Sequence, residues 1–192
     1  AGMVTPLQMA SAYAVFANGG FRVNPFIVAR ITDSKGNVIM EEKPSTAGDE
    51  SIRAISARNA FIMDSMLHDV ATRGTAAKTN VLKRSDLAGK TGTTNDSHDA
   101  WFAGFQSQLV GVAWIGFDQP RNLGDRETGG GLALPIWIDY MAKALRGVPE
   151  STRAVPPGII QANGDYYFDD YPPGRAVSTV GLSADTVPDG SA

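Results

Sequence analysis

Three consecutive strand candidates joined by very short connections restrict the fold of this chain more than any other feature. They lie at residues 87–94, 100–105 and 109–117. Strands joined this tightly pair as antiparallel neighbours, because parallel pairing needs a long crossover connection. Residues 109–117 are apolar at almost every position, which is typical of an interior strand that is covered on both faces.

The first helix is predicted to begin at Thr5. Thr5 and Gln8 have the spacing of a capping box, and Pro6 suits the first helical position because it has no amide hydrogen to leave unpaired. The almost wholly apolar stretch 9–17 that follows predicts a helix buried on most sides. Asn18 and the two glycines after it are predicted to end the helix.

Two further helices and a hairpin are predicted around the strands. Apolar residues at three-to-four spacing between Ser56 and Gly74 predict the second helix, and Leu134 opens a third. Residues 26–32 and 38–40 flank a turn-rich linker and predict a β-hairpin. The buried side of the third helix is predicted to carry Ile136, Trp137, Tyr140, Met141 and Leu145. This order of elements indicates an α+β fold, in which helices flank an antiparallel sheet.

Composition changes after Gly147, which is predicted to end the third helix. Six of the eleven prolines lie beyond it. The chain is therefore predicted to consist of one domain over residues 1–147 and a Pro-rich C-terminal extension over residues 148–192. We expect the extension to be an extended segment with an aromatic patch at 166–168, and residues from about Val155 onward to be dispensable for the chemistry.

Charge and composition exclude several kinds of partner and cofactor. The chain has 17 Lys and Arg against 20 Asp and Glu, a net charge of −3, and so lacks the basic excess that nucleic-acid binding needs. Because it has no cysteine and only two distant histidines, the sequence predicts no disulfide, no thiolate nucleophile and no metal site. No cofactor is expected.

Two short patterns suggest chemistry, and the sequence argues against both. Gly89-Lys90-Thr91 has the letters that end a phosphate-binding loop, but Arg84 stands where that motif needs its first glycine. Ser97, His98 and Asp99 are the residue types of a catalytic triad. Neighbouring side chains on a strand point to opposite faces, however, so three consecutive residues cannot bond in series.

The stretch Lys90-Thr91-Gly92-Thr93 is the strongest candidate for a site. It lies on a predicted strand and combines a cation, two hydroxyl groups and a glycine. Lys90 supplies charge for an anion, Gly92 lets a ligand approach the backbone, and a strand edge that faces a cleft offers N–H donors. On a regular strand Lys90 and Gly92 face one way and the two threonines the other, unless local twist turns them toward one cleft.

This stretch resembles the third active-site motif of penicillin-binding proteins and serine β-lactamases. The likeness extends along most of the chain, over TPLQMASAYAVFANGG (5–20), RGTA (73–76), AGKTGTTN (88–95), DAWFAGF (99–105), WIGFD (114–118) and TGGGLALPIW (128–137). In this order the stretches are similar to class A penicillin-binding proteins of the 1A type, the bifunctional peptidoglycan synthases. The resemblance covers residues from about 5 to 146 and implies a transpeptidase fold of the penicillin-binding and β-lactamase type.

Two motifs of that family are missing. No lysine has a serine three residues before it, and no Ser-x-Asn occurs. In the family both motifs precede the segment that Thr5 onward resembles. The resemblance therefore implies that the chain is the C-terminal part of a transpeptidase domain and is inactive by itself. Its expected partner is the N-terminal half, which carries the nucleophilic serine.

For the whole enzyme, the resemblance implies peptidoglycan cross-linking at the periplasmic side of the inner membrane. The substrates would be stem peptides ending in D-Ala-D-Ala, which β-lactams mimic. Lys90 and Thr93 are expected to be catalytic, Lys90 through its charge and Thr93 through a backbone N–H in the oxyanion hole. Thr91, Gly92, Thr93 and Thr94 are expected to bind substrate. A D,D-carboxypeptidase, a serine β-lactamase and a non-catalytic binding module are the alternatives.

Overall fold

The computed structural model describes residues 3–174 of the chain. It divides into two compact units, of which the first extends to Pro156 and the second begins at Pro157. The first unit contains α1 (Pro6–Ala17), α2 (Ala57–Arg73), α3 (Leu134–Ala144), β1 (Arg30–Thr32), β2 (Val38–Glu41), β3 (Ala88–Thr93), β4 (Asp99–Gln106) and β5 (Leu109–Gly116). Short 3₁₀ and π-helical segments also occur in it: η1 (Glu50–Ile52), η2 (Ala77–Leu82), η3 (Asn95–Ser97) and η4 (Gly129–Ala133).

The three predicted strands form one antiparallel sheet in the order β3-β4-β5. The interior strand of this described sheet is β4, so the prediction that residues 109–117 are interior is wrong. Among the described strands β5 pairs only with β4. Even so, Val110 packs in the cluster around Ala17, and Ala113 packs in the cluster around Trp137. The apolar sequence of β5 therefore reflects two covered faces, not two neighbouring strands.

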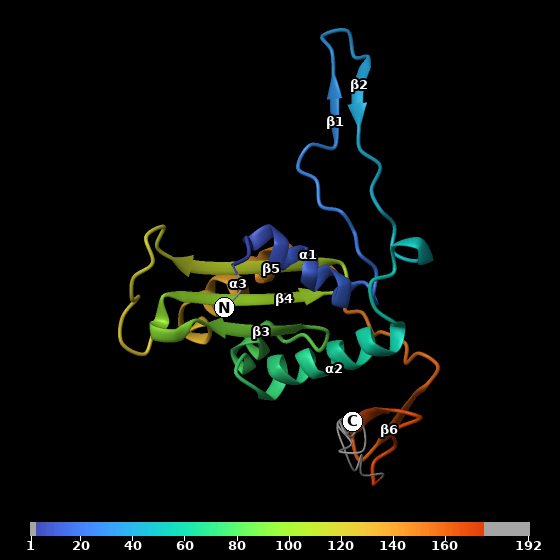
Figure 1. Ribbon diagram of the computed structural model, residues 1–192, viewed down its shortest axis with the longest axis vertical. Coiled ribbons are helices and arrows are strands. Elements are labelled where there is room, and N and C mark those ends of the chain that lie inside the picture. The colour runs from blue at the N-terminus through green and yellow to red at the C-terminus, as the bar shows by residue number, and fades with distance from the viewer. Residues whose placement is uncertain (1–2, 175–192) are drawn as a thin grey trace, which may run out of the picture. The chain divides into compact units, whose positions relative to one another are not determined.

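Helices cover both faces of this sheet (Figure 1). α1 and α2 pack on one face, where Ala17 and Leu67 join Phe105 in a buried cluster. α3 packs on the other face, where the Trp137 ring meets the Phe102 ring edge-on with centroids 4.9 Å apart. Phe102 and Phe105 lie three residues apart on β4, so their side chains point to opposite faces. The predicted α+β fold, an antiparallel sheet flanked by helices, is confirmed.

α1 begins as predicted but is less buried than predicted. The Gln8 N–H donates to Thr5 Oγ1 at 3.2 Å and the Thr5 N–H donates to Gln8 Oε1 at 2.8 Å, which completes the capping box. Of the helix residues only Ala17 is buried, and Leu7 is 51% exposed. Among the described residues, the sheet and α2 pack on one side of α1 and leave its other side uncovered.

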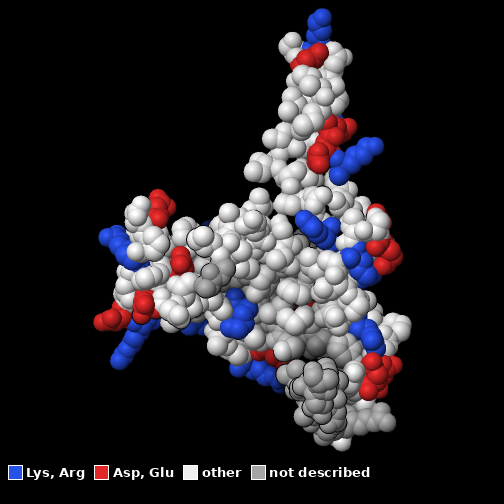
Figure 2. Space-filling model, in the orientation of Figure 1, with Lys and Arg blue, Asp and Glu red and all other residues white. Residues whose placement is uncertain are grey.

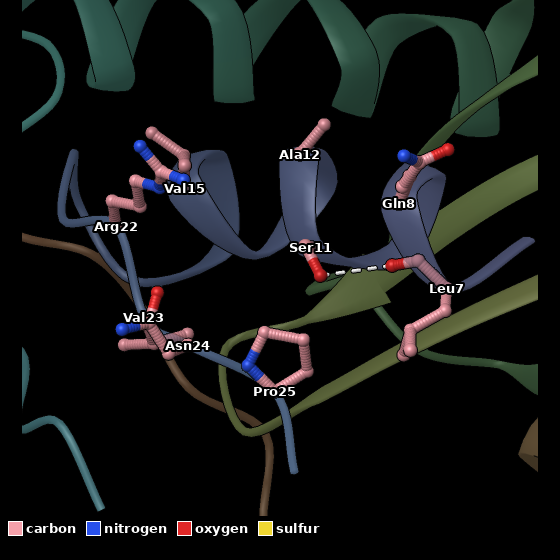
Figure 3. Close-up of a pocket in the computed structure, with 9 residues that line it drawn as sticks. All are labelled: Leu7, Gln8, Ser11, Ala12, Val15, Arg22, Val23, Asn24 and Pro25. Atoms are coloured by element: carbon pink, nitrogen blue, oxygen red, sulfur yellow. Dashed lines mark hydrogen bonds between the residues drawn. The ribbon is translucent and has the colours of Figure 1, made fainter. Parts of the chain in front are cut away.

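The uncovered side of α1 borders a shallow groove of about 400 Å³ (Figure 3). Leu7, Ser11 and Val15 line it from the helix, and residues 22–25 line it from the segment that follows. In the view of Figure 2, charged side chains lie mainly around the periphery of the body, and few interrupt the area around α1. None of the lining residues belongs to β3, so the groove is separate from the predicted site.

The remaining two helices form at the expected residues, and the hairpin forms with a shorter first strand than predicted, Arg30–Thr32 instead of residues 26–32. Ser56 caps the start of α2, and Gly74 lies at its end. β1 and β2 pair as an antiparallel hairpin, and all their residues are exposed. On α3 the buried stripe is narrower than predicted, because Ile136 and Tyr140 are about half exposed while Trp137, Met141 and Leu145 are buried.

Residues 148–153, here called the strap, belong to the first unit and are bonded to the rest of it. Arg84 Nη1 donates to the Val148 carbonyl oxygen at 2.7 Å. Arg153 Nη1 donates to the Phe16 carbonyl oxygen at 2.8 Å, near the C-terminal end of α1. The strap thus packs with the domain although composition assigns it to the extension.

The second unit contains a hairpin that the sequence analysis missed. Its strands are β6 (Ile159–Ala162) and β7 (Asp165–Phe168), which pair antiparallel. Asn163 and Gly164 between them both have positive φ, 54° and 90°, as a tight hairpin turn requires. The aromatic patch at 166–168 therefore lies on a strand and not on an extended tail. Residues 175–192 of the predicted extension lie outside the described residues.

Candidate active site

Four of the predicted site residues, Lys90 to Thr93, lie on β3, at the edge of the sheet that no other described strand occupies, and Thr94 directly follows that strand. The Thr94 N–H donates to the Asp99 carbonyl oxygen at 3.1 Å, and residue pairs along an antiparallel ladder alternate between bonded and non-bonded. Counted back from that pair, Thr93 and Thr91 fall at non-bonded positions. Their N–H and C=O groups therefore point away from β4, toward the open edge.

The Lys90 side chain is hydrogen-bonded to Thr91, the next residue on the strand. Its side chain is exposed, and Nζ donates to the Thr91 carbonyl oxygen at 3.0 Å and to Thr91 Oγ1 at 3.2 Å. The carbonyl is accessible because it points off the sheet. Alternation along a strand would put the two side chains on opposite faces. The length of the lysine side chain overcomes that separation and brings a cation and a hydroxyl together at one edge.

Besides Lys90, the Thr91 hydroxyl has a second hydrogen-bond partner, which lies outside β3. Thr91 Oγ1 lies 2.9 Å from Oγ1 of Thr75, in the turn that follows α2. Thr91 is half-buried and Thr75 is exposed. The end of α2 is thereby linked to the strand that carries the predicted site.

The Thr93 hydroxyl is held by the main chain of η4. The Gly129 N–H donates to Thr93 Oγ1 at 3.1 Å. A Cβ atom at Gly129 would overlap the carbonyl oxygens of Gly92 and Trp101. Because only glycine lacks that atom, Gly129 is the residue that lets η4 lie directly against β3 and β4.

Gly92 and Thr94 contribute in different ways. A Cβ atom at Gly92 would lie 3.2 Å from the Trp101 Cβ, so a side chain there would crowd the neighbouring strand. The Asp99 N–H donates to Thr94 Oγ1 at 2.8 Å, which closes the connection between β3 and β4. Thr94 therefore has a structural partner, and its contact with substrate stays a prediction.

Three groups that position this edge were missed in the sequence: Thr75, Gly129 and His68. His68 Nδ1 donates to the Leu87 carbonyl oxygen at 3.0 Å, one residue before β3, so α2 holds the start of the strand. Thr75 and Gly129 lie in stretches that resemble the family, which is the signal that could have identified them. Their contacts with β3 join residues far apart in sequence, and no local pattern predicts such contacts.

Asp99, the carboxylate of the Ser97-His98-Asp99 pattern, has a structural partner. Trp114 Nε1 donates to Asp99 Oδ1 at 2.8 Å, so this carboxylate is bonded to an indole and begins a strand. Among residues 3–174, no group of three or more His, Asp or Glu side chains could hold a metal ion. In the same residues, no helix has both the length and the apolar character needed to cross a membrane.

Most of the chain aligns with proteins of known family. Residues 2–140 match the model of the penicillin binding protein transpeptidase domain. Penicillin-binding protein 1A from Neisseria lactamica is 46% identical over 170 residues, which cover 88% of this chain and 21% of that protein. Penicillin-binding protein 1A from Pseudomonas aeruginosa is 43% identical in an alignment that covers 84% of this chain and 25% of that protein.

Solved structures of related proteins have the same fold. Penicillin-binding protein 1A from Haemophilus influenzae superposes with a TM-score of 0.78 at 35% identity, over 86% of this chain and 32% of that one. The imipenem acyl-enzyme complex of penicillin-binding protein A from M. tuberculosis gives a TM-score of 0.57 at 27% identity, over 74% of this chain and 31% of that one. The chain spans about a fifth to a quarter of the curated relatives' length. It belongs to the penicillin-binding protein transpeptidase family.

Proposed function

We propose that this chain is part of a peptidoglycan D,D-transpeptidase and that β3 supplies the edge along which the substrate binds. The observation that supports the proposal best is the common edge of Lys90, Thr91 and Thr93, with one cation, two hydroxyl groups and outward backbone donors. These groups suit a peptide that presents a terminal carboxylate beside the carbonyl under attack. Membership of the transpeptidase family supports the same reaction.

The proposed reaction passes through an acyl-enzyme. A serine hydroxyl attacks the carbonyl carbon between two D-alanines, the serine proton passes to the leaving amine, and the terminal D-alanine departs. An amine of a second stem peptide then attacks the ester carbonyl, which forms the cross-link and frees the serine. This chain has no Ser-x-x-Lys. We therefore assign the serine and its activating lysine to another part of the domain and expect this chain alone to be inert.

Each residue of the stretch has a distinct role in this proposal. The Thr93 N–H supplies half of the oxyanion hole, a donor whose loss typically costs about 3 kcal/mol of transition-state stabilisation. The hydroxyls of Thr91 and Thr93 donate to the terminal carboxylate. Lys90 adds positive charge beside them, Gly92 gives the ligand clearance, and Thr94 lines the end of the edge.

β-Lactams are expected to acylate the same serine, because their strained amide and carboxylate resemble the D-Ala-D-Ala end. The imipenem acyl-enzyme of the M. tuberculosis relative supports this expectation. We place the complete enzyme at the periplasmic side of the bacterial inner membrane, where its peptidoglycan substrate is assembled.

Fluorescent penicillin tests the proposal directly. The purified chain is incubated with the probe alone, and then together with the separately expressed remainder of the transpeptidase domain, and the two polypeptides are separated on a denaturing gel. We expect label on the added polypeptide only. Covalent label on this chain by itself would contradict the assignment of the nucleophile. Formation of a cross-linked peptide from two stem peptides separates a transpeptidase from a carboxypeptidase or a β-lactamase, which transfer the acyl group to water.

A further inference from the structure

Thr75 lies outside β3 but contacts its substrate edge. It follows Gly74, the residue that ends α2, and its Oγ1 lies 2.9 Å from Thr91 Oγ1. The Thr75 side chain is exposed, so it is not part of the hydrophobic core. The roles proposed above for the residues of β3 do not include it.

The neighbours of Thr75 hold it in place. Ala76 is fully buried, and its N–H donates to the Val70 carbonyl oxygen at 3.1 Å. On the other side, a Cβ atom at Gly74 would lie 2.8 Å from the Val70 Cα, so the turn passes close against the last turns of α2. Thr75 is therefore presented to β3 from a tightly packed turn.

Counting donors and acceptors shows what this contact does for Thr91. A threonine hydroxyl has one O–H donor and two acceptor sites. Lys90 Nζ, which can only donate, occupies one acceptor site of Thr91 Oγ1. When Thr75 donates to the second site, the Thr91 O–H has no acceptor among residues 3–174 and is left to donate to a ligand. A carboxylate, which can only accept, favours this arrangement.

We infer that Thr75 is a positioning residue, which saturates the acceptor sites of Thr91 so that the Thr91 hydroxyl donates to the carboxylate of the substrate or β-lactam. The inference rests on the proposed function and adds to it a residue from outside the Lys-Thr-Gly stretch. Thr75 acts through Thr91 and does not itself touch the reacting atoms.

The test uses the complete penicillin-binding protein and the second-order rate constant of acylation by fluorescent penicillin. Thr75→Val keeps the shape but removes the donor, and we expect it to slow acylation by about tenfold, the upper range of one net hydrogen bond. Thr75→Ser restores the hydroxyl and is expected to restore the rate to within about twofold. In a protein that already carries Thr91→Val, adding Thr75→Val is expected to change the acylation rate little, because the Thr91 hydroxyl through which Thr75 acts is absent.

Thr72→Val is the matched control, because Thr72 Oγ1 bonds only to carbonyl oxygens of its own helix. It is expected to leave the acylation rate unchanged. A Thr75→Val rate equal to that of the unsubstituted protein would overturn the positioning role, and so would a Thr75→Ser variant as slow as Thr75→Val. An unsubstituted protein that takes no label at all would overturn the proposed function, and this inference with it.

Discussion

The two threonine hydroxyls at the edge of β3 are held by different kinds of group. Thr91 is bonded to side chains, those of Lys90 and Thr75, whereas Thr93 accepts from the main-chain N–H of Gly129. Substitution can delete a side-chain donor, but a main-chain donor can only be displaced. The two hydroxyls can therefore be perturbed separately, one by removing a partner and one by moving a loop.

Lys90→Ala in the complete protein is expected to slow β-lactam acylation by about tenfold or more, the loss that follows removal of a charged hydrogen-bond donor. Its thermal midpoint should change little, because the side chain is exposed and contributes charge, not packing. Stopped-flow acylation and a thermal melt measure the two effects. Lys143→Ala, an exposed lysine in the last turn of α3, is the control. Acylation kinetics unchanged by Lys90→Ala would remove Lys90 from the site.

The sequence alone identifies the candidate site residues but not the contacts that hold them. Lys90 to Thr93 are consecutive, so their residue types identified the candidate edge without any knowledge of the fold. Thr75 lies sixteen residues from Thr91 in sequence, and its contact is created by the turn after α2. Such a contact depends on how α2 packs beside β3, which residue types do not encode locally.

Among the elements, η4, the segment directly before α3, lies against the sheet through Gly129. Gly129→Ala would force its Cβ against backbone oxygens of β3 and β4, so η4 must shift and the donor to Thr93 moves with it. We expect slower acylation by about tenfold. Gly131→Ala is the matched control, because its Cβ meets only the Thr128 hydroxyl at 3.4 Å. Equal rates for the two variants would show that the close approach of Gly129 is not required.

Two element predictions that rest on a local signal are confirmed, and one that depends on neighbouring strands is wrong. The capping box at Thr5 and the glycine after α2 are read from a few adjacent residues. Whether β5 is interior depends on pairing partners, and apolarity reports covered faces instead. The hairpin of β6 and β7 is an exception, because its signal is local: Asn163-Gly164 lies between apolar and aromatic residues. The high proline content of the region led to the prediction of an extended segment instead.

At the scale of the whole molecule, the strap is bonded to the domain through Asp86. This carboxylate accepts from Arg84, from Gln106 and from the Ser151 N–H. Burial alone would raise the pKa of Asp86, but these hydrogen bonds and the Arg84 charge outweigh burial and hold the pKa below its usual value. The ionised carboxylate therefore stabilises the folded domain at neutral pH.

Asp86→Asn is expected to lower the free energy of unfolding by about 1–3 kcal/mol at pH 7, because buried donors lose a charged acceptor. A carboxyl whose folded-state pKa is lowered stabilises above its unfolded pKa of about 3.9 and loses that contribution as the pH falls through the folded value. The difference between the two proteins should therefore shrink below pH 4. Urea unfolding of the domain at several pH values measures it, and a difference that does not vary with pH would contradict the assignment.

Deletions separate the strap from the rest of the predicted extension. Removing residues from Val155 onward in the complete protein is expected to leave penicillin labelling intact, because the bonds of Asp86 and Arg153 to the strap and α1 are kept. Removing residues from Val148 onward takes those bonds away and is expected to lower the thermal midpoint of the domain. Loss of labelling in the shorter deletion, with the protein still folded, would make the second unit part of the site.

The most direct measurement is a crystal structure of the complete protein acylated by a penicillin. We expect the acyl carbonyl oxygen to lie about 2.7–3.1 Å from the Thr93 backbone nitrogen, the distance of an oxyanion-hole bond. We also expect the penicillin carboxylate to lie within hydrogen-bond distance of Thr91 Oγ1 and Thr93 Oγ1, beside the Lys90 ammonium. An adduct whose carbonyl and carboxylate lie away from the open edge of β3 would contradict the proposed role of this strand.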